Sequence, residues 1–161
     1  MDLFAAGKRR LYAGDRPGPV ARVLNRGWAI LGSAGLGPRR QPTLEVPGRR
    51  SGRTISLPVV VAGLDGERYL VSMLGEHAAW VANARAAGGR VVLRRGRREQ
   101  VLLEEVAVRD RAPIIRRYLE VAPGARPHIP VDRRAPLGEF ERIAADVPVF
   151  RVRADTGDRV L

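Results

Sequence analysis

The chain has 161 residues, 45% of them hydrophobic and 29% charged, which suits one domain with a buried core and excludes a disordered chain. It contains no cysteine, which excludes disulfides, thiolate metal sites and cysteine nucleophiles. The two histidines, His77 and His128, are too far apart in the sequence for a ligand pair on one helix, so we predict no metal site.

The net charge of +12 comes almost entirely from arginine, because Lys8 is the single lysine among 29 basic residues. Alanine, glycine, proline and valine are also abundant, a bias typical of GC-rich coding, and we attribute much of the charge to it. Aromatic residues, which would stack on bases, make up only 5% of the chain, so we predict no nucleic-acid partner. Such a surface would still attract a polyanionic cofactor or an anionic membrane.

Residues 1–41 are predicted to form an N-terminal tail and an amphipathic helix over 19–34. The apolar run 28–37 is too short to cross a bilayer, and its arginine-rich flanks are unlike those of a cleaved signal peptide. We therefore predict a cytoplasmic protein whose first helix packs on the rest of the domain, with Trp28 partly buried. Peripheral contact of this helix with the inner membrane is the alternative.

Strand-like segments follow this helix. Residues 43–46 alternate between polar and apolar side chains, and 54–62 form a longer β-branched and apolar run in which Pro58 indicates a sheet edge or a bulge. An Asp-Gly dipeptide at 65–66 is typical of a two-residue hairpin turn. The run 54–62 and residues 68–74 are therefore predicted to pair as a hairpin.

Three short helices and three further strands are predicted in the rest of the chain. The helices cover 78–87, 110–120 and 136–145, and the strands cover 91–95, 99–108 and 147–153. Gly88 and Gly89 are expected to end the first of these helices, and Asp110 to cap the second.

Hairpins dominate this pattern, and it contains no β-α-β repeat. The predicted fold class is therefore mainly β with α (α+β), an antiparallel split β-barrel with an N-terminal helix and short peripheral helices. We assign residues 42–154 to the barrel as the cofactor-binding domain and residues 155–161 to a C-terminal tail.

The loop 47–54, with the sequence Pro-Gly-Arg-Arg-Ser-Gly-Arg-Thr, is the strongest local candidate for a binding site. Its two glycines permit a tight turn, Ser51 adds a hydroxyl and three arginines converge, a combination that can hold a phosphate through guanidinium and backbone N–H contacts. An ordinary arginine-rich hairpin turn is the alternative. The lysine and the spacing of a P-loop are missing, so neither ATP nor GTP is predicted.

A second candidate lies where the strand 68–74 ends and the next helix begins. The free N–H groups at the start of a helix favour an anion or a carbonyl oxygen. Trp80, Asn83 and Arg85 would project from this helix near the turn. Core packing of Trp80, and a cap or surface role for Asn83, are the alternatives.

Three motifs in order over residues 45–95 resemble the deazaflavin-dependent nitroreductase family. They are Gly-Arg-Arg-Ser-Gly-Arg-Thr, Asp-Gly-x-x-Tyr-Leu-Val-Ser and Gly-Glu-x-x-x-Trp-Val-x-Asn-Ala-Arg. Members of that family are oxidoreductases that use the reduced 8-hydroxy-5-deazaflavin coenzyme F420, and they share the split β-barrel of flavin-binding proteins. The resemblance implies hydride transfer from reduced coenzyme F420 to an electrophilic acceptor, namely a quinone, a nitro compound or an enone.

The resemblance also implies a set of cofactor-binding residues. The loop 49–53 would hold the phosphate side of the coenzyme, Pro58 and Val59 would line the ring slot, and residues 72–75 would form its edge. The full set is Arg49, Arg50, Ser51, Gly52, Arg53, Pro58, Val59, Ser72, Met73, Leu74, Gly75, Trp80, Asn83 and Arg85.

Residues 118–130, which lie outside the hairpins, are predicted to cover the acceptor. Tyr118 is the candidate catalytic residue, as a hydrogen-bond donor to the acceptor oxygen, and core packing beside Ile115 and Leu119 is the alternative. Two other functions stay open. The barrel could bind FMN or haem, or it could be a non-catalytic protein that binds a cofactor or a membrane surface. Monomer and homodimer are both compatible with the sequence.

Overall fold

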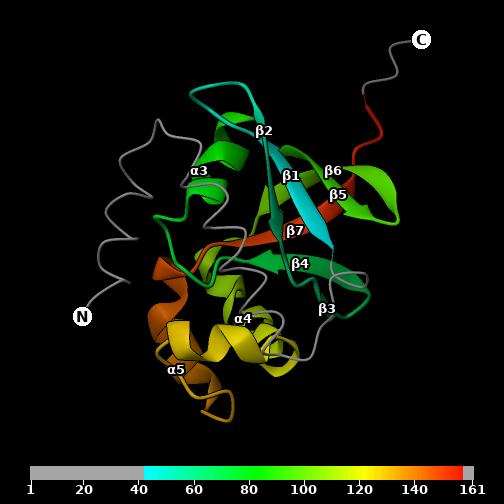
Figure 1. Cartoon of the computed structure of the whole chain (residues 1–161). Helices are drawn as coiled ribbons and strands as arrows, with labels where there is room; N and C mark the ends of the chain where they lie inside the picture. Colours follow the sequence, from blue (N-terminus) through cyan, green and yellow to red (C-terminus); the bar gives the residue numbers. More distant parts are fainter. Residues whose placement is uncertain (1–41, 158–161) are drawn as a thin grey trace.

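The structure is a computed structural model, and it describes residues 42–157. The predicted first helix and Trp28 lie outside these residues. Seven strands form one antiparallel sheet in the order β2-β1-β5-β6-β7-β4-β3 (Figure 1). The strands are β1 Thr43–Pro47, β2 Thr54–Pro58, β3 Ala62–Leu64, β4 Glu67–Val71, β5 Arg90–Arg95, β6 Arg97–Glu105 and β7 Val149–Ala154.

The connection between the two edge strands requires the sheet to curl. β2 and β3 form opposite edges, yet only residues 59–61 join them. The four Cα steps from Pro58 to Ala62 span at most about 15 Å. Seven flat strands would hold their edges about 29 Å apart. The sheet is therefore curled into a split barrel, which confirms the predicted fold class.

Local residues determine two of the hairpin turns. Asp65 and Gly66 both have positive φ, 51° and 77°, as a type I′ turn requires, and Leu64 pairs with Glu67 across them. Gly96, with φ of 76°, turns the chain between β5 and β6. The Asp-Gly turn and the second hairpin were both predicted from the sequence.

The predicted strand 54–62 is wrong as a single element. β2 ends at Pro58, and the hairpin partner of β4 is β3, which begins at Ala62. Between these two strands the chain crosses from one edge of the curled sheet to the other. Pro58 does lie in an edge strand, where its missing N–H leaves no gap in the ladder.

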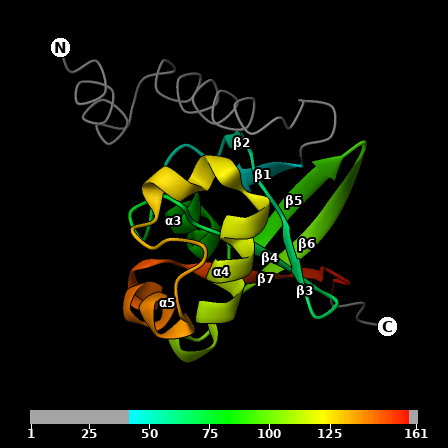
Figure 2. The same cartoon turned by 90° about the horizontal axis from the view of Figure 1, so that it is seen from below.

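Within residues 42–157, three α-helices cover the sheet, and they are α3 Ala79–Ala86, α4 Ala112–Val121 and α5 Leu137–Ile143. Three short 3₁₀ helices flank them, η1 Val108–Asp110, η2 Pro123–His128 and η3 Ala144–Asp146. α4 and α5 pack on the same side of the sheet, and the β5–β6 hairpin extends away from them (Figure 2). No helix in residues 42–157 has the length and apolarity that a bilayer span requires.

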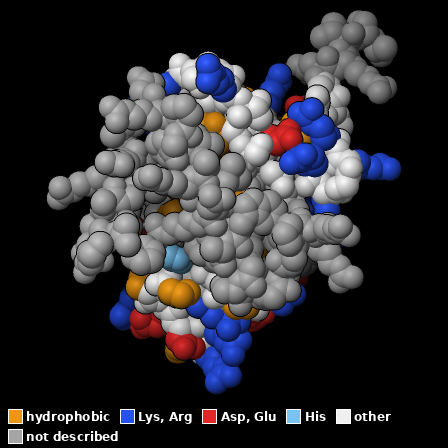
Figure 3. Space-filling model, in the orientation of Figure 1, with side chains coloured by type: hydrophobic (Ala, Val, Ile, Leu, Met, Phe, Trp, Pro, Cys, Tyr) orange, Lys and Arg blue, Asp and Glu red, His pale blue; other side chains and the backbone are white. Residues whose placement is uncertain are grey.

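On the face seen in Figure 3, charged side chains gather at the upper right and at the lower end of the molecule, which α4 and α5 occupy. On the face seen in Figure 3, arginine side chains lie at this lower end with acidic side chains among them, and hydrophobic side chains lie directly above. Apolar and basic surfaces therefore adjoin each other near these two helices.

The predicted capping of α4 by Asp110 is wrong. Asp110 lies in η1, and Arg111 occupies the N-cap position without a side-chain cap bond. Pro113 stands in the first turn of α4, where its missing N–H needs no partner.

Two clusters of buried apolar side chains form the core. One lies between α4, α5 and strands β3 and β4, and it includes Tyr118 and Phe140. The other lies between α3 and strands β1, β5, β6 and β7, and it includes Leu44 and Val101. Because Val81 and Ala84 of α3 are fully buried in the second cluster, this helix is fixed against the sheet.

Candidate functional site

The loop between β1 and β2 is a compact turn held by its own backbone. The Gly48 N–H donates to the Arg53 carbonyl at 2.8 Å, and the Gly52 N–H donates to the Gly48 carbonyl at 2.9 Å. The Ser51 hydroxyl oxygen accepts the Arg53 N–H at 3.2 Å. Gly52 has a φ of +71°, which favours glycine at this position.

Asn83 anchors this loop to α3. Its side-chain oxygen accepts two hydrogen bonds from Arg49, one from the backbone N–H at 3.1 Å and one from Nη1 at 2.8 Å. Asn83 is only 3% exposed, so its amide is held in place by the surrounding core. The structure thus joins two of the predicted segments, which are 34 residues apart in sequence.

The tip of the loop retains unused donors. Within the described part of the chain, no hydrogen bond uses the N–H of Arg50 or Ser51, and no ion pair uses the guanidinium of Arg50 or Arg53. All three residues are exposed. Adjacent backbone N–H groups flanked by guanidinium groups are a donor set that fits a phosphate.

Trp80 and Arg85 extend from α3 in ways that connect it to the barrel. The Trp80 ring packs on Phe150 at a centroid distance of 5.5 Å. Arg85 pairs with Glu76 and Glu105, and these hydrogen bonds raise the pKa of Arg85 and lower the pKa of Glu76 below its usual range. Arg85 is therefore neutralised by carboxylates and ties α3 to β6.

Residues 72–75 form a closed turn at the end of β4. The buried Ser72 hydroxyl donates to the Gly75 carbonyl at 2.7 Å, and the Gly75 N–H donates back to the Ser72 carbonyl at 3.1 Å. Gly75 has a φ of +81° and approaches the Asp146 carbonyl. The turn leaves Met73 half-buried and Leu74 48% exposed, so it presents an apolar edge to its surroundings.

A groove of about 310 Å³ lies beside this turn. It is lined by Met73, Leu74, Gly75, His128, Ile129, Pro130, Ile143, Asp146 and Val147. The structure therefore brings the predicted edge of the ring slot next to the segment that was predicted to cover the acceptor. Ile143, Asp146 and Val147 were not predicted, because the sequence around the end of a helix does not show which of its side chains line a groove.

Pro58 and Val59 lie away from this groove. In the strand register Pro58 pairs with Thr43, at the end of β1 opposite to the loop 48–53. The turn 72–75 follows the end of β4 that pairs with the start of β7. A ring slot that includes both groups would therefore run along the barrel, and its composition stays a prediction.

Tyr118 is 5% exposed within the cluster of α4, and burial raises its pKa. It does not line the groove beside Met73.

We expect Tyr118→Phe to keep the packing of the ring and leave the rate of acceptor reduction unchanged, with a loss of at most about 1 kcal/mol in unfolding free energy. Steady-state kinetics and urea unfolding of the purified variant measure both. A loss of rate of about tenfold or more at unchanged stability would instead show that the hydroxyl acts on the acceptor.

Arg111 is a residue whose role the sequence did not reveal. Its side chain is buried, and its Nε donates to the Val106 carbonyl at 2.8 Å. Its Nη1 donates to the carbonyls of Ala144 at 3.0 Å and Val147 at 3.3 Å, and its Nη2 reaches Glu105 at 3.5 Å. Arg111 thereby fixes η3, one wall of the groove, to the start of α4 and the end of β6.

The comparisons with known proteins give distant structural likeness. No protein-family model and no curated protein matches the chain. A protein of unknown function from Agrobacterium tumefaciens shares 12% identity with a TM-score of 0.49 over 71% of this chain, which spans only 48% of that protein. A reductase dependent on reduced coenzyme F420 shares 20% identity with a TM-score of 0.45 over 71% of this chain and 95% of that one.

A NimC/NimA family protein from Clostridium acetobutylicum shares 11% identity with a TM-score of 0.44, over 89% of this chain and 96% of that one. All three TM-scores lie below 0.5. The architecture described above therefore rests on the strand pairing of this chain itself.

Proposed function

We propose that the chain is an oxidoreductase that transfers a hydride from reduced coenzyme F420 to an electrophilic acceptor, namely a quinone, a nitro compound or an enone. When bound, the coenzyme supplies the hydride, and the protein supplies position, electrostatics and exclusion of water. This division of roles agrees with a groove whose lining is mostly apolar.

The contact between Arg49 and Asn83 carries this proposal. The resemblance assigns the arginine loop and the Trp-Val-x-Asn helix to one cofactor, and the fold brings these two segments into direct contact through a buried amide. Holding Arg49 in this way leaves Arg50, Ser51 and Arg53 at the tip. The donors that residues 42–157 leave unused there can bind the phosphate side of the coenzyme.

The second support is the position of the groove. The turn 72–75, α3 and the arginine loop lie around one end of the barrel, where β4 and β1 end and β5 begins. A coenzyme held by the loop therefore has an apolar groove at the same end of the sheet, lined by Met73 and Leu74 on one segment and Ile129 on another. An acceptor stacked on the ring would lie in that groove.

The decisive experiment is a fluorescence titration of the purified full chain with coenzyme F420 and, separately, with FMN. Saturable binding of F420, followed by oxidation of the reduced coenzyme when menadione or nitrobenzene is added, supports the proposal. Preference for FMN would indicate the alternative flavin-binding function. Binding without turnover of any acceptor would indicate a non-catalytic binding protein.

We expect Arg53→Ala to weaken the binding of coenzyme F420 by about tenfold to a hundredfold, because a charged hydrogen bond contributes roughly 1.5–3 kcal/mol. The measurement is the Kd from the same fluorescence titration. Arg97→Ala is the matched control, since it removes another exposed arginine, at the β5–β6 turn on the opposite end of the sheet. Equal Kd values for Arg53→Ala and wild type would remove the phosphate assignment of the loop.

A further inference from the structure

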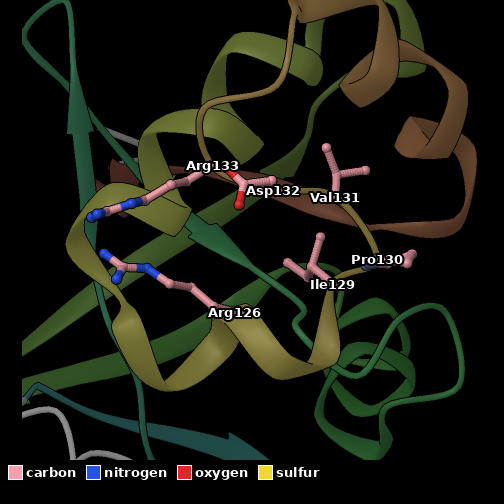
Figure 4. Close-up of a pocket in the computed structure, with 6 residues that line it drawn as sticks. All are labelled: Arg126, Ile129, Pro130, Val131, Asp132 and Arg133. Atoms are coloured by element: carbon pink, nitrogen blue, oxygen red, sulfur yellow. The ribbon is translucent and has the colours of Figure 1, made fainter.

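A second groove, of about 460 Å³, adjoins the first. It is lined by Arg126, Ile129, Pro130, Val131, Asp132 and Arg133, and it shares Ile129 and Pro130 with the groove beside Met73. Figure 4 shows Arg126 and Arg133 extending side by side in the same direction from the two ends of this segment, with Ile129 and Pro130 between them along the chain.

Arg126 is held in place by the end of α4. Its Nε donates to the Leu119 carbonyl at 3.0 Å, and its Nη2 donates to the Glu120 carbonyl at 3.5 Å. A cation at the last carbonyls of a helix is favourable, so the side chain is preorganised. Its Nη1 takes part in no hydrogen bond within residues 42–157.

Arg133 has no such anchor. Its side chain is half-buried, yet it makes no hydrogen bond or ion pair within the part of the chain that the structure describes. The buried side-chain nitrogens without a partner in residues 42–157 do not include those of Arg133, so its guanidinium stays open to an anionic group placed beside it.

Asp132 lies in the same groove but does not neutralise the two arginines. One of its carboxylate oxygens accepts the Arg134 N–H at 2.8 Å, and no ion pair within 4.0 Å joins it to Arg126 or Arg133. Two guanidinium groups and one carboxylate leave the groove with a net positive charge. Two neighbouring guanidinium groups can donate several hydrogen bonds to a planar carboxylate, whereas a single cation can donate fewer.

We propose that Arg126 and Arg133 form a subsite for the acidic group of the acceptor, so that the preferred acceptors are electrophiles carrying a carboxylate. This proposal rests on the proposed function. The two grooves share Ile129 and Pro130, so an acceptor whose carboxylate lies between the arginines would have to extend across these two residues to bring its electrophilic end into the groove beside Met73.

The test compares 4-nitrobenzoate with methyl 4-nitrobenzoate, which has the same ring and no charge. The full chain, loaded with reduced coenzyme F420, should reduce both, with a KM about tenfold lower for the acid. In Arg133→Gln this difference should disappear while kcat is retained. Arg134→Gln is the matched control, since Arg134 is exposed and does not line the groove.

A second measurement keeps this subsite separate from the coenzyme. Calorimetric titration of the coenzyme-free protein with 4-nitrobenzoate should show saturable binding that Arg133→Gln weakens about tenfold. If the coenzyme does not bind but this titration behaves as expected, the proposed function fails and the anion subsite stands. Equal KM values for acid and ester in the wild type overturn the subsite. A loss of coenzyme affinity in Arg133→Gln with an unchanged preference for the acid also overturns it, because the arginines would then hold the coenzyme.

Discussion

Arg111→Ala is expected to lower the free energy of unfolding by about 3–5 kcal/mol, because it removes a buried charge that is fully engaged. Three backbone carbonyls, those of Val106, Ala144 and Val147, would each lose this donor inside the protein. Buried acceptors that lose a partner are costly. Urea unfolding followed by circular dichroism measures the change.

Arg109→Ala is the control for this prediction. Arg109 lies two residues earlier, its side chain is 86% exposed, and its ion pair with Asp110 spans 3.8 Å. Its removal should change stability by no more than about 0.5 kcal/mol, as for most surface substitutions. Equal effects of the two substitutions would show that the buried hydrogen bonds of Arg111 do not stabilise the fold. Where Arg111→Ala fails to fold, Arg111→Lys keeps the charge, loses the fork of donors, and should give an intermediate stability.

Gly89→Ala is expected to destabilise the protein by about 3 kcal/mol or more, through both strain and a steric clash. Gly89 has a φ of +81°, and a Cβ there would lie 2.4 Å from the Leu103 carbonyl oxygen. The backbone cannot simply move aside, because the Gly89 carbonyl accepts the Leu103 N–H at 2.8 Å and the Gly89 N–H donates to the Ala84 carbonyl at 2.8 Å. The thermal midpoint and the urea midpoint both report the loss.

The neighbouring glycine separates the two causes. Gly88 has a φ of +65°, and a Cβ there would meet nothing within 4 Å. Gly88→Ala should therefore cost only the conformational strain, about 1–2 kcal/mol. If Gly89→Ala is no more destabilising than Gly88→Ala, then the Leu103 carbonyl of β6 does not lie this close to Gly89 in solution.

Those parts of the fold that depend on neighbouring residues could be predicted from the sequence. The Asp65–Gly66 turn is an example, because positive φ at two adjacent positions is a property of those residues themselves. The three helices were predicted within a few residues, and α4 shows why. Four of its residues recur at helical spacing and are buried, namely Ile114, Ile115, Tyr118 and Leu119.

The division of 54–62 into two strands could not be predicted in this way. It depends on the curl of the whole sheet, which brings its edges close enough for three residues to connect them. Nor could the role of Arg111 be predicted. In a chain with so many arginines, residue type does not distinguish a buried guanidinium with four acceptors from an exposed one.

In the candidate site, too, local features could be predicted from the sequence and features that arise from tertiary packing could not. The glycines and the serine of the loop 48–53 are sufficient to predict its tight turn. The contact of Arg49 with Asn83, and the placement of Met73 in one groove with residues 128–130, arise from tertiary packing. Tyr118 was the natural candidate by chemistry, but the helix turns it towards the core, and the residues of that segment which line the groove are His128, Ile129 and Pro130.

The position of β7 has a consequence for the nascent chain. β7 lies between β6 and β4, and it pairs with both, so it joins a four-stranded half of the sheet to a two-stranded half. Until residues 149–154 have left the ribosome, β6 and β4 both present unpaired backbone edges. During translation the two halves of the sheet therefore stay unpaired with each other, and their exposed edges can pair with other chains. A chain that is released before Val149 has been added would be prone to aggregate.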